Sequence, residues 1–282
     1  MARPAGKSDM TRRLAILQQF DPAGGVPHYI RAHLEGLRPV AERIVLVSNS
    51  PVAAEDRAVA EAICDAVIER PNTGWDFAGW RDALALEDMA QWDEVILTNS
   101  SVIGPLFPLA SIFAEMDTRR EKEAFDFWGM VFSRQIRHHL QSYFFVFSAP
   151  VIRSDAWRSF WRGVADIDDK DEVIARYEAG ITVALASGGF SYAAYMPDPP
   201  LARRIRICDW EVLGKRIHIP FDCTRVNRTV RWHDELVEQG FPYLKASLLW
   251  GKDTWRLKDF DRIRDLTAGT FDWSAIERDM QK

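Results

Sequence analysis

The sequence is poor in cysteine, and its three cysteines do not have the spacing of a disulfide framework. Cys64, Cys208 and Cys223 are odd in number, and no two of them form a CxxC pair. This pattern argues against both a disulfide scaffold and a structural zinc site. It is typical of a protein in a reducing cytosol.

Long apolar runs are also missing. The longest, Tyr143 to Ile152, contains Ser148 and Pro150 and is too short to span a bilayer. The first 13 residues are polar and lack the apolar core of a signal peptide. We therefore expect a cytoplasmic protein. Any contact with lipid would be peripheral, at the inner membrane.

An excess of basic charge is lacking as well. The chain has 36 Lys and Arg against 41 Asp and Glu, which gives a formal net charge of −5. No overall basic field favours nucleic acid or an anionic membrane, so we predict no nucleic-acid partner. A ligand that carries phosphate must be held by a local site.

What the chain does have is enough apolar material for a large core. Apolar residues make up 47% of its 282 residues, and short β-branched runs alternate with helical stretches in the first hundred. This alternation predicts an α/β sheet with right-handed crossovers. The expected strands are Leu14–Leu17, Ile44–Val47, Ala66–Glu69 and Glu94–Thr98, and the expected helices are Val26–Leu37, Ala53–Cys64 and Phe77–Met89.

Beyond Pro105 the pattern becomes less regular, but no repeat or low-complexity linker divides the chain. We predict a flexible N-terminus over residues 1–13, a single α/β domain over 14–250 and a C-terminal helical extension over 251–282. The further expected elements are helices at Leu109–Met116, Ser154–Val164 and Asp171–Ser187 and strands at Phe125–Phe132 and Ser142–Phe147.

The loops after the strands are expected to bind ligand, because parallel strands present their carboxyl ends at one edge of a sheet. In the segment Asn72–Trp80, Gly74 permits close backbone approach and Asp76 can cap a helix whose N-terminus favours a diphosphate. Arg81 is the nearest cation. The alternative is an ordinary capped helix with buried tryptophans and a solvated arginine.

The strand that ends at Thr98 leads into Asn99, Ser100 and Ser101. This turn contains no carboxylate, and magnesium or manganese prefers carboxylate oxygens. Binding there is either independent of metal or completed by a ligand from elsewhere in the chain. A plain strand-end turn is the alternative.

Polar residues border two of the later apolar strands. Asp126, His139 and Gln141 could line an acceptor pocket, although each alone could equally be a satisfied or surface group. The pair His138 and His139 lacks the helical HExxH spacing, so we assign no metal to it.

The expected helix Asp171–Ser187 carries an acidic residue beside its apolar stripe. Glu178 lies roughly 80° from the centre of that stripe, on its flank. We expect partial desolvation to raise its pKa, which would suit a general base. A boundary glutamate paired with an arginine is the alternative. The stripe consists of Val173, Ile174, Tyr177, Ile181, Ala184 and Leu185.

The expected helix Ser154–Val164 combines Trp157 and Trp161 with arginines. Contact with a membrane surface is one interpretation. Core packing is the favoured one, because tryptophans at helical spacing usually anchor an interior.

Six motifs in a consistent order resemble the rhamnan synthesis F family. They extend over most of residues 14–245, and together they are more specific than any one alone. The motifs are NTGWDFAGW at Asn72–Trp80, ILTNSSVIGPL at Ile96–Leu106, DFWG at Asp126–Gly129, HLQSYFFVF at His139–Phe147, YEAGIT at Tyr177–Thr182 and FPYLK at Phe241–Lys245.

The resemblance implies a GT-A-like (Rossmann-like) fold with a mixed, mainly parallel sheet flanked by helices. It implies an inverting glycosyltransferase that takes rhamnose from dTDP-rhamnose to a glycan or lipid-linked glycan of the bacterial surface. By analogy with GT-A enzymes, Glu178 is the base and Asp126, His139 and Gln141 contact the acceptor. The implied donor-binding residues are Asn49, Asn72, Gly74, Asp76, Arg81, Asn99, Ser100, Ser101 and Lys245.

One departure from the family pattern concerns the metal. The family usually shows Asn-Asp-Ser where this chain has Asn99, Ser100 and Ser101. The missing Asp leaves Mg²⁺ or Mn²⁺ dependence open, together with the choice of a UDP- or GDP-sugar as donor. The competing interpretation is a nucleotide-sugar or carbohydrate-binding protein that keeps the fold without catalysis.

Overall fold

The computed structural model describes residues 11–212, 215–251, 253–254, 257 and 260–280. Residues 1–10 of the expected flexible N-terminus lie outside the described residues, as do 252, 255–256, 258–259 and 281–282 of the expected C-terminal extension. The strands are β1 (Arg13–Gln19), β2 (Arg43–Ser48), β3 (Ala66–Glu69), β4 (Glu94–Asn99), β5 (Val102–Ile103), β6 (Phe127–Ser133), β7 (His139–Leu140), β8 (Phe144–Ser148), β9 (Tyr192–Met196), β10 (Ile205–Val212), β11 (Lys215–Asp222) and β12 (Leu244–Lys245).

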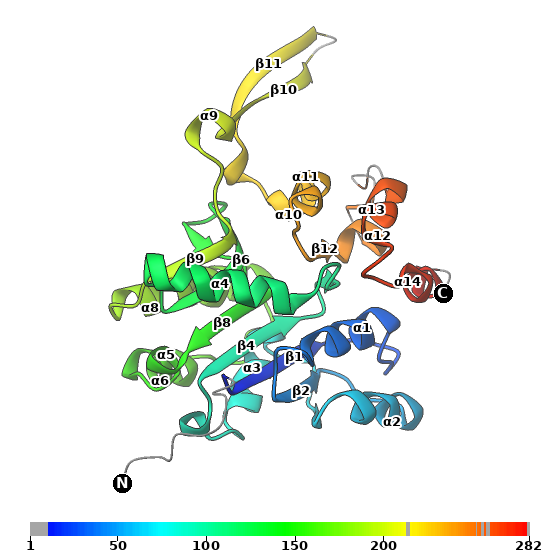
Figure 1. Cartoon of the computed structure of the whole chain (residues 1–282), viewed down its shortest axis with the longest axis vertical. Helices are drawn as coiled ribbons and strands as arrows, with labels where there is room; N and C mark the ends of the chain where they lie inside the picture. Colours follow the sequence, from blue (N-terminus) through cyan, green and yellow to red (C-terminus); the bar gives the residue numbers. More distant parts are fainter. Residues whose placement is uncertain (1–10, 213–214, 252, 255–256, 258–259, 281–282) are drawn as a thin grey trace.

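The helices alternate with these strands in the first half of the chain and dominate its end (Figure 1). The α-helices are α1 (His28–Leu37), α2 (Ala54–Ile63), α3 (Trp75–Leu84), α4 (Leu109–Glu123), α5 (Ala149–Ile152), α6 (Asp155–Arg162), α7 (Lys170–Val173), α8 (Ala179–Ser187), α9 (Leu201–Arg204), α10 (Arg228–Arg231), α11 (His233–Glu238), α12 (Ser247–Trp250), α13 (Phe260–Thr267) and α14 (Trp273–Met280). The 3₁₀ turns are η1 (Met89–Gln91) and η3 (Cys223–Arg225), and η2 (Ile174–Glu178) is a π-helical turn.

The main sheet is mixed, and its strands follow the order β3-β2-β1-β4-β8-β6-β7, with β9 paired to β6. β1, β2, β3 and β4 are parallel neighbours, as are β6 and β9, whereas β8 runs antiparallel to β4 and β6. The predicted GT-A-like (Rossmann-like) class, a mainly parallel sheet flanked by helices, is confirmed. The buried apolar runs of β1, β2 and β4 are what strands covered on both faces require.

Strand direction decides which loops can meet. Because β8 is antiparallel to both β4 and β6, these two strands run the same way, and β9 follows them. The carboxyl ends of β1, β2, β3, β4, β6 and β9 therefore lie at one edge of the sheet. The short β7 and the start of β8 lie at the same edge. We call this the carboxyl edge.

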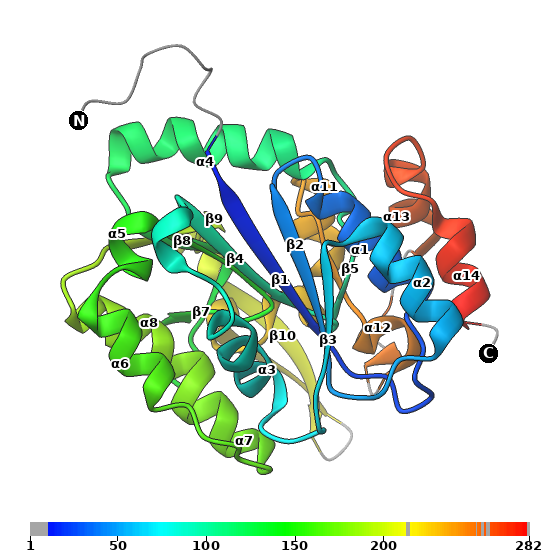
Figure 2. The ribbon, with the colours of Figure 1, turned by 90° about the horizontal axis from the view of Figure 1, so that it is seen from below.

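Helices cover both faces of the sheet, and each face has its own core (Figure 2). On one face, α1 and α4 pack through residues such as Leu34 and Phe113. On the other, α3, α6 and α8 contribute Trp80, Trp157 and Ile181, in keeping with the expected core role of the α6 tryptophans. Trp80 also donates its indole N–H to the carbonyl of Thr98, 3.1 Å away, and so ties α3 to β4.

The last third of the chain adds a smaller third core beside α1. It contains Ile103 from β5, Leu244 from β12 and Trp273 from α14. β12 pairs with β5, which brings Lys245 back to the carboxyl edge next to the end of β4. Among the described residues, none of the helices is long and apolar enough to cross a membrane.

Candidate functional site

The N-terminus of α3 meets the carboxyl edge of the sheet through a strained turn. Gly74 has φ +66° and Trp75 has φ +52°, so two successive residues adopt the left-handed conformation. A Cβ on Gly74 would lie 2.5 Å from the Cβ of Ala78 and 2.9 Å from the Cα of Asp166. Glycine is therefore required for α3 to begin this close to the segment before α7.

Asn49, which follows β2, holds this turn in place through a side-chain hydrogen bond. Its side-chain amide donates to the carbonyl of Trp75 over 3.3 Å, and its oxygen accepts from Arg70 over 3.1 Å. Arg70 also donates to the carbonyl of Thr73 and to Asp82. Asn49 is buried, and it holds the backbone that leads into α3.

Asn99 is the centre of a hydrogen-bonded cluster at the end of β4. Its amide donates to Asp76 Oδ2 over 2.8 Å, and its Oδ1 accepts from the backbone N–H and the hydroxyl of Ser101 at 3.1 and 2.6 Å. Lys245 Nζ then donates to Ser101 Oγ over 3.1 Å and lies 4.3 Å from the ring centre of Tyr143. These hydrogen bonds connect four residues from three separate segments of the chain. We call Asp76, Asn99, Ser101 and Lys245 the Asn99 cluster.

Glu178 lies near the Asn99 cluster, because its charge acts on both Asp76 and Lys245. It is the last residue of the π-helical turn η2, and its side chain is 22% exposed. His139 Nε2 lies 3.7 Å from Glu178 Oε1, and His139 Nδ1 lies 2.7 Å from the carbonyl of Arg137, to which it can donate. π-turns recur at functional sites.

The charges of these groups act on one another. Burial and the charge of Glu178 raise the pKa of Asp76 from 3.8 to about 6, although Lys245, Lys170 and the hydrogen bond from Asn99 oppose the rise. Burial lowers the pKa of Lys245 to about 8, against the attraction of Glu178 and Asp76. Two carboxylates and one ammonium therefore share a partly desolvated space.

The expected direction of the Glu178 pKa was wrong. Burial does raise it, but the hydrogen bond from His139, the charges of Lys245 and His139 and a hydrogen bond from Ser142 outweigh burial, so the pKa lies below its ordinary value of 4.5. Glu178 is therefore ionised at neutral pH. The carboxyl group with the raised pKa is that of Asp76.

Other predicted donor residues lie at or beyond the rim. Ser100 donates its backbone N–H to the carbonyl of Gln18 and is partly exposed, and Asn72 is exposed on the loop after β3. The partners that Arg81 contacts lie outside the Asn99 cluster. Its guanidinium contacts Asp82 at 2.7 Å, Asp166 at 3.0 Å and a backbone carbonyl in the loop after α6 at 2.9 Å.

The predicted acceptor residues are not all brought together. His139 joins Glu178, and Gln141 is buried nearby, where its side-chain oxygen lies 3.5 Å from the hydroxyl of Thr229. Asp126 precedes β6 and therefore lies at the opposite edge of the sheet. There its carboxylate accepts from the backbone N–H and hydroxyl of Ser191 at 2.8 and 3.0 Å.

Sequence reasoning missed two glutamines at the end of β1. Gln18 and Gln19 are each 1% exposed, and the side-chain oxygen of each has no hydrogen-bond donor among the described residues. Buried amide oxygens usually have a partner, so these two are exceptions at the carboxyl edge. The signal was present as two polar residues at the end of an otherwise apolar strand.

Among the described residues, the side chains here do not by themselves form a cage for a divalent cation. Within the described part of the chain, no group of three or more His, Cys, Asp and Glu residues is placed to hold a metal ion. The carboxylate in the Asn99 cluster is that of Asp76, and the ammonium of Lys245 acts on it. Magnesium and manganese sites are built from oxygen ligands, and a fixed ammonium beside them opposes a second cation.

Comparison with known proteins identifies relatives of this chain. The family model described as rhamnan synthesis protein F matches residues 44–206. The "uncharacterized protein y4gN" of Sinorhizobium fredii is 30% identical over 200 residues, which cover 68% of this chain and 51% of that protein. The virulence protein VirA of Vibrio anguillarum is 28% identical over 199 residues, which cover 66% of this chain and 62% of that protein. The match thus spans between half and two thirds of each relative.

Among solved structures, one similar chain is the mannosyltransferase PcManGT of Pyrobaculum calidifontis, in complex with GDP-Man and Mn²⁺. It is 11% identical, with a TM-score of 0.45, and the alignment covers 96% of this chain and 79% of that one. At this level the likeness concerns the fold alone.

Proposed function

Because the chain belongs to the rhamnan synthesis protein F family, we propose that it is a glycosyltransferase that moves a sugar from a nucleotide-diphosphate donor to a surface glycan. The observation that carries the proposal is the meeting of Glu178 with the Asn99 cluster at the carboxyl edge of the sheet. An ionised carboxylate, an ammonium and a helix N-terminus share one partly buried site there. Together they supply a base and a place for an anionic leaving group.

The donor is held across the ends of β1, β2 and β4. The nucleoside lies at the end of β1, beside Gln18 and Gln19. The diphosphate lies against the N-terminus of α3, whose free N–H groups and dipole favour anions. Lys245 contributes positive charge from the other side. We propose dTDP-rhamnose as the donor, on the strength of the family.

The reaction proceeds by a single displacement with inversion. A hydroxyl oxygen of the acceptor forms a bond to the anomeric carbon while the bond from that carbon to the phosphate oxygen breaks. The hydroxyl proton goes to Glu178, which is ionised and therefore able to accept it. The nucleoside diphosphate departs with the electron pair, and Lys245 stabilises its negative charge.

His139 positions the base. With Nδ1 donating to the carbonyl of Arg137, the ring presents Nε2 to Glu178. The hydrogen bond from His139 lowers the pKa of Glu178 and so favours the ionised carboxylate. The histidine does not touch the reacting atoms in this mechanism.

A second candidate function is nucleotide-sugar or glycan binding without turnover. The observation that favours it is Ser100, which stands where the resemblance predicts an aspartate. Binding without transfer would leave the Asn99 cluster intact and Glu178 without a chemical role. The two functions differ in whether the donor is consumed.

The test compares Glu178→Gln with a matched control, Glu172→Gln, which lies on α7 with its side chain 49% exposed. We expect Glu178→Gln to lower kcat by about 10²- to 10⁴-fold, because a positioned general base contributes that much. Its donor-induced thermal shift should stay as in the wild type, and Glu172→Gln should retain full rate. The screen uses dTDP-rhamnose and UDP-, GDP- and CMP-sugars, each with Mg²⁺, Mn²⁺ or EDTA.

Retention of full transferase activity by Glu178→Gln would remove Glu178 from the mechanism. A donor that shifts the melting temperature of the wild type but is neither transferred nor hydrolysed would favour the binding protein. Loss of the shift in EDTA would show that a divalent cation takes part in donor binding.

A further inference from the structure

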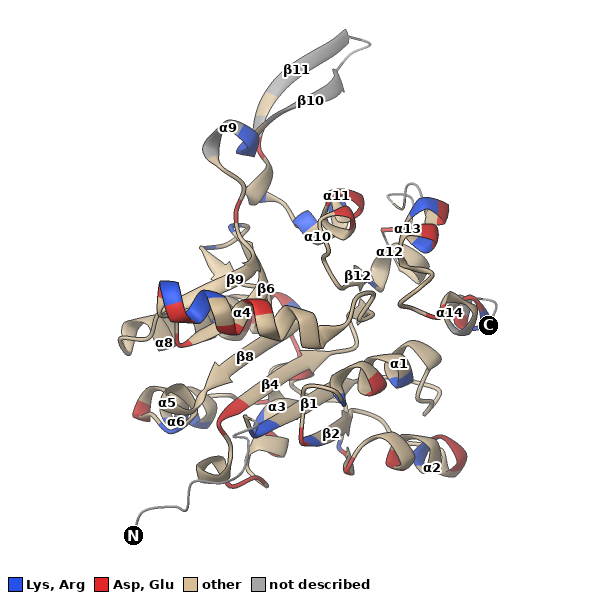
Figure 3. Cartoon of the chain, viewed as in Figure 1, with Lys and Arg blue, Asp and Glu red and all other residues tan. Residues whose placement is uncertain are grey.

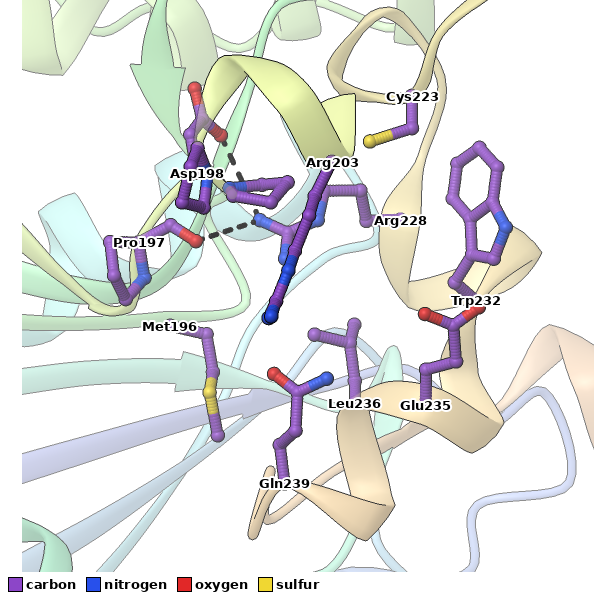
Figure 4. A pocket seen from close by; sticks show the side chains of 12 residues that line it. Met196, Pro197, Asp198, Arg203, Cys223, Arg228, Trp232, Glu235, Leu236 and Gln239 are labelled. Atoms are coloured by element: carbon purple, nitrogen blue, oxygen red, sulfur yellow. Dashed lines mark hydrogen bonds and ion pairs between the residues drawn. The ribbon is translucent and has the colours of Figure 1, made fainter. Parts of the chain in front are cut away.

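A cavity opens at the carboxyl edge, where β9 ends. Its volume is about 280 Å³, and it lies between the segment after Met196 and helices α10 and α11 (Figure 4). Small-molecule sites usually measure about 300–1,000 Å³, so this cavity has room for about one sugar residue. None of its lining residues belongs to the donor site described above.

The polar groups of the cavity offer both a hydrogen-bond acceptor and a donor. Asp198 Oδ2 accepts from Arg134 over 2.9 Å, whereas the buried Oδ1 has no hydrogen-bond donor among the described residues and lies 3.7 Å from Arg228 Nη1. The guanidinium of Arg203 has no hydrogen-bond or ion-pair partner in the described part of the chain. Figure 4 shows it extending from α9 across the cavity toward Gln239.

The remaining walls are apolar and flat. Met196 and Leu236 form part of the lining, and the indole of Trp232 stands at one side (Figure 4). An aromatic face beside carboxylate, amide and guanidinium groups suits a ring that has C–H groups on its faces and hydroxyls around its rim. Hydroxyls both donate and accept, which matches Asp198 Oδ1 and Arg203 together.

The charge of the lining favours a neutral ligand. Two cations, Arg203 and Arg228, are balanced by two carboxylates, Asp198 and Glu235. A phosphate or uronate bound to Arg203 would share the cavity with the carboxylates of Asp198 and Glu235, whose charges repel it. Figure 3 shows that acidic and basic residues also alternate along outer helices such as α4 and α13.

The cavity borders the catalytic cluster. α10 packs against β12, the strand that carries Lys245. Thr229 of α10 contacts Gln141, and the charge of Arg228 acts on Tyr143, whose ring lies under Lys245. A glycan whose terminal hydroxyl reaches Glu178 could therefore extend past Tyr143 into the cavity.

We propose that this cavity is an acceptor subsite that binds a neutral sugar unit of the glycan, adjacent to the unit that receives the transferred sugar. The proposal rests on the proposed transferase function for the identity of the glycan as an acceptor. Binding of a neutral sugar there does not depend on turnover.

The test measures glycan binding directly. The full chain is applied to an array of bacterial O-antigen and capsular oligosaccharides, both neutral and acidic, as wild type, Arg203→Ala, Gln239→Ala and the control Arg158→Ala. Arg158 lies on α6, paired with Asp155 at the surface. We expect the wild type and the control to retain a neutral oligosaccharide, and Arg203→Ala to weaken that binding about tenfold, the effect of losing one charged hydrogen bond.

Absence of any retained glycan, or equal binding by Arg203→Ala and the wild type, would overturn the proposal. Retention of acidic glycans alone would overturn the neutral class. The donor-induced thermal shift of the same proteins is measured in parallel. Glycan binding without a donor-induced thermal shift would count against the transferase function and support the subsite. A donor-induced shift without glycan binding would support donor binding and overturn the subsite.

Discussion

Asp76 carries a cost in stability that its role explains. Its pKa is about 6 in the folded protein, against an ordinary value of 3.8. The folded state therefore favours the protonated form, and stability is lost as the pH rises from about 4 through about 6. Active sites commonly hold charges in such unfavourable surroundings.

We expect Asp76→Asn to be more stable than the wild type at pH 7.5, by up to about 3 kcal/mol, because it removes the ionisation that folding opposes. The gain should shrink at pH 5 and vanish near pH 4. Urea unfolding at several pH values measures it. The control is Asp155→Asn, whose carboxylate is 95% exposed. A gain that is independent of pH, or a loss at pH 7.5, would contradict the assigned pKa.

At the residue scale the sequence indicated Glu178 but not its environment. The helical period placed it beside an apolar stripe, and burial alone would raise its pKa. The groups that lower it include His139, 39 positions earlier, and Lys245, 67 positions later. Such partners are brought together by the tertiary fold. The local sequence pattern therefore could not predict whether the pKa of Glu178 is raised or lowered.

At the scale of the element, the turn into α3 determines whether the donor site forms. Gly74→Ala places a Cβ 2.5 Å from that of Ala78 at a backbone φ of +66°. We expect a loss of at least about 2 kcal/mol, since a left-handed L-residue alone costs about 1–2 kcal/mol. Donor affinity should fall with it, because the N-terminus of α3 must move.

Gly180→Ala is the matched control for this prediction. A Cβ at Gly180 meets nothing within 4 Å, and the residue lies in α8. Alanine should stabilise that helix by about 0.5–1 kcal/mol. Thermal unfolding and donor titration of both variants check the pair. Equal donor affinity in Gly74→Ala and the wild type would show that the turn does not support the donor site.

The π-turn η2 is the element that periodicity missed. The sequence predicts one helix over 171–187, whereas the chain forms α7, η2 and α8. One residue inserted into a helix rotates the residues after it by about 100°. The stripe still holds at Val173, Tyr177, Ile181 and Leu185, which are four apart and buried. The apolar stripe therefore continues through the π-helical turn, with a spacing of four residues.

At the scale of the whole molecule, strand direction was the missing information. The β-α alternation predicted the first four strands to within two residues at each end. It could not reveal that β6 runs parallel to β4 two positions away across β8. Asp126 therefore lies at the far edge of the sheet, although it stands in a family motif. Lys245 was carried to the site by the pairing of β12 with β5.

The hairpin β10–β11 is expected to contribute little to the stability of the rest of the molecule. Its strands pair only with each other among the described residues, and it projects from the body (Figure 1). Arg204 joins Asp222 at its base over 2.6 Å. Because an isolated hairpin adds little stability, we expect replacement of residues 206–221 by a short Gly-Ser linker to lower the melting temperature by less than about 2 °C.

Donor-induced thermal shifts should also survive this replacement, because the Asn99 cluster contains no residue of the hairpin. Arg204→Ala in the full-length chain serves as the control, since it opens the base without shortening the chain. A fall of many degrees after replacement would mean that the hairpin packs on the body or on a second copy. Preserved stability would establish it as an arm that the transferase fold does not need in order to form.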